Sequence, residues 1–271
     1  MKYMSFNSSC AYAGITNMLE QYGIDTEDRI ISAEIGLPYL FSYENGAYSA
    51  GPMLQTAEWF NLYLKPRGLS MNETVVSKGE VCGFLQKAEC AMVGIEVSEG
   101  NKHAVVFNGM ENGQYRFINN KWEQSEEPDR LVLSEEELLR RLDDTAAVAA
   151  LQKIEAGAVD IKKYFEKSVE VLARLKSDLA VFCSKERQPQ ELRDAMNTLF
   201  RAVLLDGITM LELIGQAELC ERLRSVQREF LNVMKEGKAA VLKERIPFDV
   251  LVDVIDEYSG LIKEKIGEAA M

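Results

Sequence analysis

The pattern of the sequence changes near residues 142–150. Before this point glycines, aromatic residues and short β-rich runs alternate with short helical stretches. After it almost the whole chain has the spacing of amphipathic helices, at about 150–184, 189–204, 207–236 and 248–267. We therefore expect two domains, at 1–145 and 146–271. The first would be an α+β domain and the second an all-α, antiparallel helical bundle.

Helices are expected early in the first domain. Residues 8–22 place apolar side chains at spacings of three and four, and Gly23 ends this helix. Further helices are predicted at 27–35, from Pro52 onward and at 78–87. Residues 41–51 are rich in glycine and tyrosine, which predicts a loop, either a surface turn or a segment that lines the cleft.

An antiparallel sheet is expected to follow these helices. After a strand at 90–97, the segments HAVVF (103–107) and YRFIN (115–119) flank the dipeptide Asn112-Gly113, a strong hairpin signal. Ser134 and Glu137 then form a capping box that begins another helix. The first domain is thus predicted to be helices followed by an antiparallel sheet.

The charge argues against some classes of partner. The 271 residues carry a net charge of −12, from 31 Lys and Arg against 43 Asp and Glu, and most of it lies in the first half. This negative net charge disfavours nucleic acid and anionic membrane surfaces as binding partners. No apolar run has the length of a membrane span, and the opening MKYMSFNSSC lacks the apolar region of a signal peptide. We expect a cytoplasmic protein.

Cysteine and histidine usage limits the chemistry. The five cysteines are an odd, scattered set without a CxxC pair, which favours reduced thiols over disulfides. With one histidine, His103, no metal-ligand spacing exists, and we expect neither a metal nor a cofactor. Four cysteines are interpreted as small buried hydrophobic residues: Cys82, Cys90, Cys183 and Cys220.

Cys10 stands apart because it lies in the first turn of the first predicted helix. The unpaired N–H groups and the dipole of a helix N-terminus favour the thiolate, which is the reactive form. His103 opens a strand, and Asn119 and Asn120 end the next antiparallel strand, where an amide can hydrogen-bond the imidazole. These residues form a Cys-His-Asn arrangement. The alternative is that Asn119 and Asn120 are turn residues with no role in catalysis, since asparagine is common in turns.

In order and spacing these segments resemble the papain-like fold. Among proteins with this fold, the segments are most similar to two bacterial groups. These are the peptidase domains that trim bacteriocin leaders and the N-terminal domain of the butirosin biosynthesis protein H family. The matching segments are CAYAGITNMLEQYG (10–23), HAVVFNG (103–109) and YRFINN (115–120). The resemblance spans about residues 5–142, and the helical part after it also suits the butirosin type.

This resemblance implies roles for particular residues. Cys10 would be the nucleophile, His103 the general base and acid, and either Asn119 or Asn120 the residue that orients the imidazole, with Asn119 preferred by strand parity. Papain-like enzymes usually carry a glutamine about six residues before the nucleophile, as an oxyanion donor. Met4 occupies that position here, and Asn7 is the candidate substitute, helped by the Cys10 backbone N–H.

Two functions follow as hypotheses. The first is a thiol hydrolase or acyltransferase that acts on an amide or thioester of a small amine-bearing molecule or a peptide, with an acyl donor as a further partner. The helical domain would then cover the cleft or form a homodimer. The second is a non-catalytic binding or assembly module that keeps the fold without the oxyanion glutamine.

Overall fold

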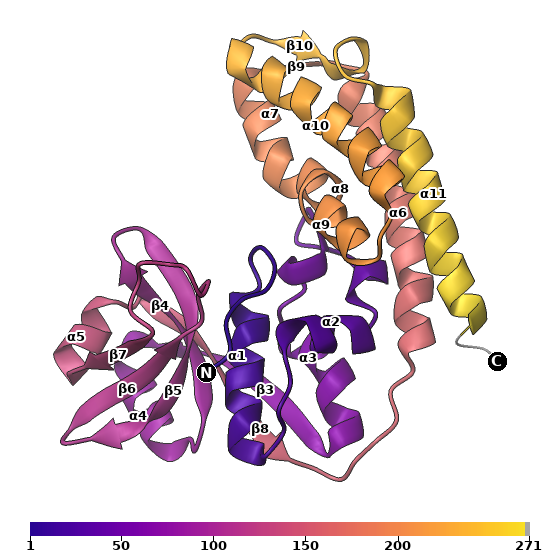
Figure 1. Cartoon of the computed structure of the whole chain (residues 1–271). Coiled ribbons are helices and arrows are strands. Elements are labelled where there is room, and N and C mark those ends of the chain that lie inside the picture. The colour runs from indigo at the N-terminus through magenta and orange to yellow at the C-terminus, as the bar shows by residue number, and fades with distance from the viewer. Residues whose placement is uncertain (269–271) are drawn as a thin grey trace. The chain divides into compact units, whose positions relative to one another are not determined.

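The computed structural model describes residues 1–268, which divide into two compact units (Figure 1). The sheet unit consists of Met1–Ile35 and Gln55–Val159. The helical unit consists of Gly36–Leu54 and the chain from Asp160 onward. This division differs from the predicted one in two places: the later boundary lies at 159/160 instead of 145/146, and Gly36–Leu54 belongs with the helices.

The sheet unit combines helices with one antiparallel sheet, as the α+β prediction requires. The sheet has six strands in the order β3-β8-β4-β5-β6-β7, and every neighbouring pair is antiparallel. Its strands are β3 (Leu69–Ser77), β4 (Ala91–Ser98), β5 (Asn101–Glu111), β6 (Gln114–Asn119), β7 (Arg130–Leu133) and β8 (Thr145–Lys153). The predicted β5–β6 hairpin is confirmed, and Asn112 and Gly113 turn the chain with φ of 51° and 76°.

Strand β8 overturns the prediction that helices begin near residue 150. Its sequence TAAVAALQK is rich in alanine, the strongest helix former, which favours the helical interpretation. In the fold it pairs with β3 along its whole length and with β4 over Val148–Ala150. Hydrogen bonding to two neighbours, with buried small side chains, outweighs local propensity here.

Helices cover both faces of the sheet. The sheet unit contains α1 (Cys10–Leu19), α2 (Asp28–Glu34), α3 (Ala57–Leu64), α4 (Val81–Lys87) and α5 (Glu135–Arg140). Side chains of α4 and α5 join Val93 and Phe107 in one buried cluster on one face. Helix α1 packs against β4 and β5 and meets Met92, which points to the opposite face because strand side chains alternate.

The predicted helix ends and starts agree with the structure, except where short 3₁₀ turns replace part of a helix. Helix α1 ends in a 3₁₀ turn at Glu20–Tyr22, and Gly23 follows with φ of 74°. The capping box of Ser134 and Glu137 is present at α5. The helix expected from Pro52 begins only at Ala57, because residues 51–53 form a 3₁₀ turn that belongs to the helical unit.

The helical unit contains six α-helices, one short β-hairpin and one pair of two-residue strands from distant parts of the chain, among the described residues. They are α6 (Ile161–Cys183), α7 (Pro189–Ala195), α8 (Arg201–Leu204), α9 (Asp206–Leu213), α10 (Ala217–Glu236), α11 (Phe248–Glu268), β1 (Phe41–Glu44) with β2 (Ala47–Ala50), and β9 (Glu186–Arg187) with β10 (Ala240–Val241). Helix α11 packs against both α6 and α10 (Figure 1). No helix within residues 1–268 is long and apolar enough to cross a membrane.

The loop predicted at 41–51 is instead the hairpin β1–β2, and it is anchored to helices. The Phe41 N–H donates to Ser168 Oγ at 2.9 Å, and the Tyr48 hydroxyl donates to Asp178 at 2.6 Å. The buried Tyr258 hydroxyl donates to the Pro38 carbonyl at 2.7 Å. The prediction failed because tyrosine and glycine signal turns, while these bonds join residues more than 120 positions apart.

Helix α1 lies so close to the sheet that Gly14 has no room for a side chain. A Cβ on Gly14 would lie 2.5 Å from Met92 Sδ and 2.7 Å from Asn120 Nδ2. Asn120 cannot move aside freely, because its amide donates to the Ala104 carbonyl and accepts from Asn17. This contact fixes the height of α1 above β5 and β6.

We expect Gly14→Ala to lower the free energy of unfolding by about 1–3 kcal/mol, because the added methyl forces α1 away from the sheet. Gly83→Ala is the matched control, since Gly83 also lies in a helix of this unit and its Cβ would meet nothing within 4 Å. The control should gain about 0.5–1 kcal/mol from better helix propensity. Urea unfolding measures both, and effects of the same sign would contradict the close contact.

Candidate active site

Cys10 and His103, which are 93 positions apart, line the same pocket of the sheet unit. The pocket has a volume of about 300 Å³. Most of its wall is small or apolar, including Met71, Met92 and Ala149. The structure therefore brings together the predicted nucleophile and the single imidazole of the chain.

Cys10 is the first residue of α1, and its position leaves the helix N-terminus open. Ser9 precedes it but makes no side-chain cap; its hydroxyl instead donates to Asp28 Oδ2 at 2.9 Å. The same carboxylate oxygen accepts the Ser5 N–H at 2.7 Å, so the buried Asp28 holds the segment that leads into the helix. The N–H groups of the first turn thus have no side-chain cap beside the thiol.

His103 is held by Asn119. The imidazole Nδ1 lies 2.9 Å from Asn119 Oδ1, and the His103 side chain is 17% exposed. Asn119 Nδ2 lies 3.2 Å from both Glu127 Oε2 and the Pro128 carbonyl oxygen, which can only accept. Oδ1 therefore faces the ring, so Nδ1 carries the proton of the neutral imidazole and Nε2 carries the lone pair.

The two candidate asparagines have different surroundings, although both are fully buried. Asn119 ends β6 opposite Val105 and contacts the imidazole. Asn120 donates to the Ala104 carbonyl at 2.5 Å and accepts from Asn17 of α1 at 2.9 Å. Asn120 thus joins α1 to the sheet, and Asn119 contacts the ring.

The predicted oxyanion donor is not in the pocket. Asn7 is exposed and does not line it, and Met4 donates its backbone N–H to the Lys121 carbonyl. Gln55, just before α3, lines the pocket instead, and its buried Oε1 has no hydrogen-bond partner among the described residues. Sequence reasoning missed Gln55 because the resemblance places a glutamine before the cysteine, not 45 positions after it.

Glu127 is the second residue that the sequence did not reveal. Its Oε2 lies 3.5 Å from His103 Nδ1, and its side chain is 19% exposed. It belongs to the loop between β6 and β7, in the acidic stretch EQSEEPD (123–129), where nothing distinguishes it from the neighbouring Glu126. Only the folded structure distinguishes the two glutamates, because it places Glu127 beside His103 and leaves Glu126 exposed.

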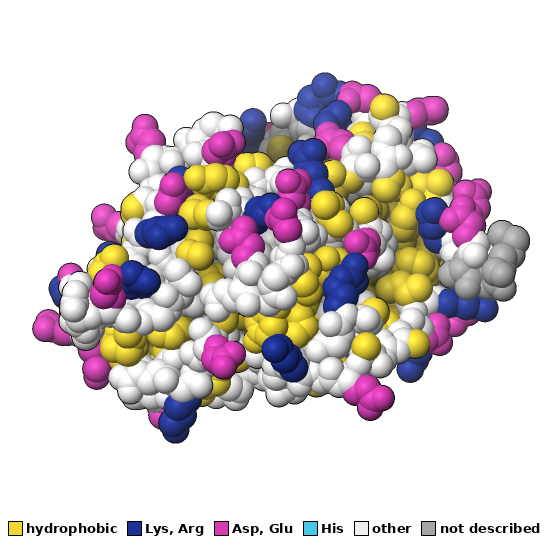
Figure 2. Space-filling view, turned by 60° about the horizontal axis from the view of Figure 1, so that its bottom comes forward, with side chains coloured by type: hydrophobic (Ala, Val, Ile, Leu, Met, Phe, Trp, Pro, Cys, Tyr) yellow, Lys and Arg dark blue, Asp and Glu magenta, His cyan; other side chains and the backbone are white. Residues whose placement is uncertain are grey.

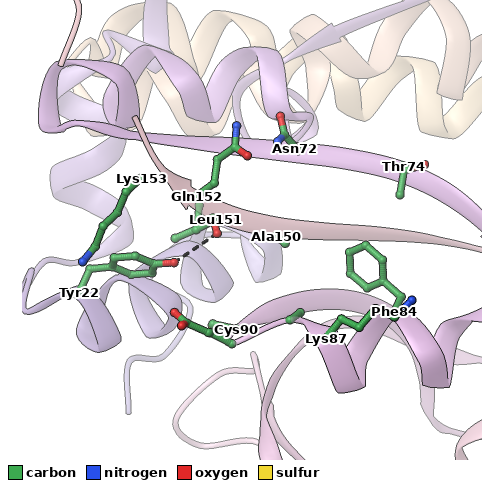
Figure 3. Close-up of a pocket in the computed structure, with 12 residues that line it drawn as sticks. Tyr22, Asn72, Thr74, Phe84, Lys87, Cys90, Ala150, Leu151, Gln152 and Lys153 are labelled. Carbon is green, nitrogen blue, oxygen red and sulfur yellow. Dashed lines mark hydrogen bonds between the residues drawn. The ribbon is translucent and has the colours of Figure 1, made fainter. Parts of the chain in front are cut away.

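A second pocket of the sheet unit has different chemistry. It has a volume of about 580 Å³ and contains Cys90 among polar and charged side chains (Figure 3). Its Tyr22 hydroxyl donates to the Leu151 carbonyl at 3.2 Å. Burial raises the pKa of the Cys90 thiol to about 12, so this cysteine is protonated at neutral pH. Cys90 is therefore not an activated nucleophile.

The other cysteines are also buried, and no disulfide joins the five. Burial raises the pKa of Cys183 to about 12 and raises those of Cys82 and Cys220. Cys10 is the partly exposed one. Residues 1–268 contain no group of three or more His, Cys, Asp or Glu side chains that fits a metal ion.

The surface does not collect charge of one sign on the face drawn in Figure 2. Acidic and basic side chains are interspersed there.

Comparison with known proteins gives a distant structural similarity. No family model and no curated protein matches the chain. Among solved structures, it is similar to the peptidase domain of Streptococcus ComA, a bi-functional ABC transporter involved in a quorum sensing pathway, with a TM-score of 0.38 and 13% identity. The match covers 55% of this chain and 96% of that chain.

Proposed function

We propose that this protein is a papain-like thiol enzyme that hydrolyses or transfers an acyl group. One observation carries the proposal: Cys10 at an open helix N-terminus and His103, oriented by Asn119, line one pocket. A thiol, an imidazole and an orienting amide are the parts that nucleophilic acyl transfer needs.

In this mechanism the Cys10 thiol transfers its proton to His103 Nε2, and the sulfur attacks the carbonyl of an amide or thioester. The new C–S bond converts the carbonyl oxygen into an oxyanion. Collapse of this intermediate expels the amine or thiol, which takes the proton from His103. The acyl group then passes from Cys10 to water or to an amine, while His103 removes a proton from the acceptor.

The oxyanion is stabilised by hydrogen-bond donors that are already positioned in the pocket. The Cys10 backbone N–H belongs to the first turn of α1, where amides have no partner within the helix. The Gln55 side-chain amide supplies the second donor when its Nε2 faces the pocket. The Oε1 atom without a partner supports this role, since rotating the amide breaks no hydrogen bond to Oε1.

The pocket also suggests a substrate class. The apolar wall and the volume of about 300 Å³ suit a short acyl group. Glu73 lies in the same lining and offers a carboxylate to an ammonium group. We therefore favour a small amine-bearing molecule or a peptide amine as the acyl acceptor.

A non-catalytic module is the second candidate, and one observation favours it. Met4 stands where papain-like enzymes usually have glutamine, and Asn7 does not line the pocket. In such a module the pocket would bind a ligand without turnover. The reactivity of Cys10 distinguishes the two candidates.

We expect iodoacetamide to alkylate Cys10 alone in the folded protein at pH 6–7, faster than glutathione at the same pH. His103→Ala should lower this rate about tenfold or more, because the imidazolium no longer stabilises the thiolate. The four buried thiols should resist, since their raised pKa keeps them protonated. Mass spectrometry locates the adducts, with guanidinium-unfolded protein as the control for all five sites. A Cys10 that reacts no faster than glutathione contradicts the enzyme proposal.

The role of Gln55 is tested with an activated ester. Gln55→Ala should slow acylation of Cys10 by p-nitrophenyl acetate about 10²–10³-fold, because one oxyanion donor is lost. Its alkylation by iodoacetamide should be unchanged, since displacement of iodide forms no oxyanion. Asn7→Ala is the matched control and should leave both rates unchanged. A loss of acylation in Asn7→Ala but not in Gln55→Ala would contradict the role of Gln55 and identify Asn7 as the oxyanion donor.

A further inference from the structure

The Glu127 carboxylate is held firmly, although it lies in a loop. Its Oε1 accepts from Asn101 Nδ2 at 2.5 Å and from Ser98 Oγ at 3.4 Å. Ser98 ends β4 and Asn101 begins β5, so the two donors flank the turn between these strands. These bonds occupy one oxygen and direct the other, Oε2, toward His103 and Asn119.

The Glu127 carboxylate and the Pro128 carbonyl together set which way the Asn119 amide points. An amide presents an oxygen on one side and two N–H donors on the other, and the two ends have nearly the same shape. Glu127 Oε2 and the Pro128 carbonyl both lack a proton to donate, so the Asn119 nitrogen must face them. The Asn119 oxygen then faces His103 Nδ1 and fixes the tautomer that leaves Nε2 free to accept a proton.

Glu127 also places a negative charge near the ring, 3.5 Å from Nδ1. Other charged groups nearby are engaged elsewhere: Lys102 pairs with Asp143, Lys121 with Asp129, and Arg141 donates to the carbonyls of Glu96 and Val97. A carboxylate at this distance favours the imidazolium that forms when Cys10 gives up its proton.

We propose that Glu127 is a positioning residue for the Cys10–His103 pair. It fixes the orientation of Asn119, and through it the tautomer of His103, and it stabilises the imidazolium. This inference rests on the proposed function, in which His103 Nε2 receives the thiol proton. A fourth side chain, from the loop after β6, thereby completes a chain of contacts from Glu127 through Asn119 to His103.

The first test compares the pH dependence of Cys10 alkylation in Glu127→Gln and the wild type. We expect the rate constant at pH 6 to fall about tenfold, because the imidazolium that forms with the thiolate loses the nearby carboxylate. At pH 10 the two proteins should react equally, because the thiolate then forms without help from the imidazole. Glu126→Gln, an exposed neighbour, should behave as the wild type, and Glu127→Asp should recover part of the loss.

The second test reads the imidazole directly and does not depend on Cys10. Because the chain has one histidine, ¹⁵N NMR of the labelled protein reports the His103 tautomer without overlap. We expect the Nδ1-protonated form in the wild type and in Glu126→Gln, and a mixture of tautomers in Glu127→Gln. A Glu127→Gln protein that keeps both the alkylation profile and the tautomer of the wild type overturns the inference.

The two tests separate this inference from the proposed function. If wild-type Cys10 reacts like glutathione while the tautomer still depends on Glu127, the enzyme proposal fails and the positioning role stands. If Glu127→Gln unfolds, which labelling of the buried cysteines reveals, Asn101→Ala replaces it. That variant removes the 2.5 Å bond that directs the carboxylate, so it should show a smaller loss of the same kind. A wild-type profile and tautomer in Asn101→Ala would then overturn the role.

Discussion

The close approach of α1 to the sheet at Gly14 is the constraint on which the site depends. A helix that carries Cys10 at its first position can share a pocket with His103 of β5 only if its axis lies near the strand. Gly14 permits this approach because a Cβ there would collide with Met92 and Asn120. The hydrogen bonds of Asn120 to Asn17 and Ala104 then fix the helix at this height.

Two adjacent asparagines contact different parts of the sheet unit, because β6 ends at Asn119 and Asn120 lies just beyond it. Asn119 is the last residue of the strand and contacts the imidazole, whereas Asn120 faces α1. Both are fully buried, where a polar group without partners is costly, and both are satisfied by specific acceptors and donors. Adjacent residues thus serve two separate sets of hydrogen bonds: Asn120 holds the helix to the sheet, and Asn119 joins His103 to Glu127.

Much of the site could be predicted from the sequence because its signals are local. The helix start at Cys10 and the hairpin at Asn112-Gly113 are short-range patterns, and the structure agrees with them. Asn119 contacts the imidazole, but the register of β5 and β6 shifts between Phe107 and Met110, so counting across an ungapped hairpin does not account for this contact. Gln55 and Glu127 reach the site through long-range packing that leaves no local pattern. Strand β8 and the hairpin at 41–50 were missed for the same reason, since pairing partners and helix contacts far along the chain decide their conformation.

The central claim is that Cys10 and His103 act on each other across one pocket. The most direct measurement is the NMR spectrum of the single imidazole before and after Cys10 is carboxymethylated, with Cys10→Ala as an unmodifiable control. We predict that modification shifts the His103 ring signals in the wild type and leaves them unchanged in the Cys10→Ala protein. Ring signals that are identical before and after complete modification of Cys10 would contradict the account.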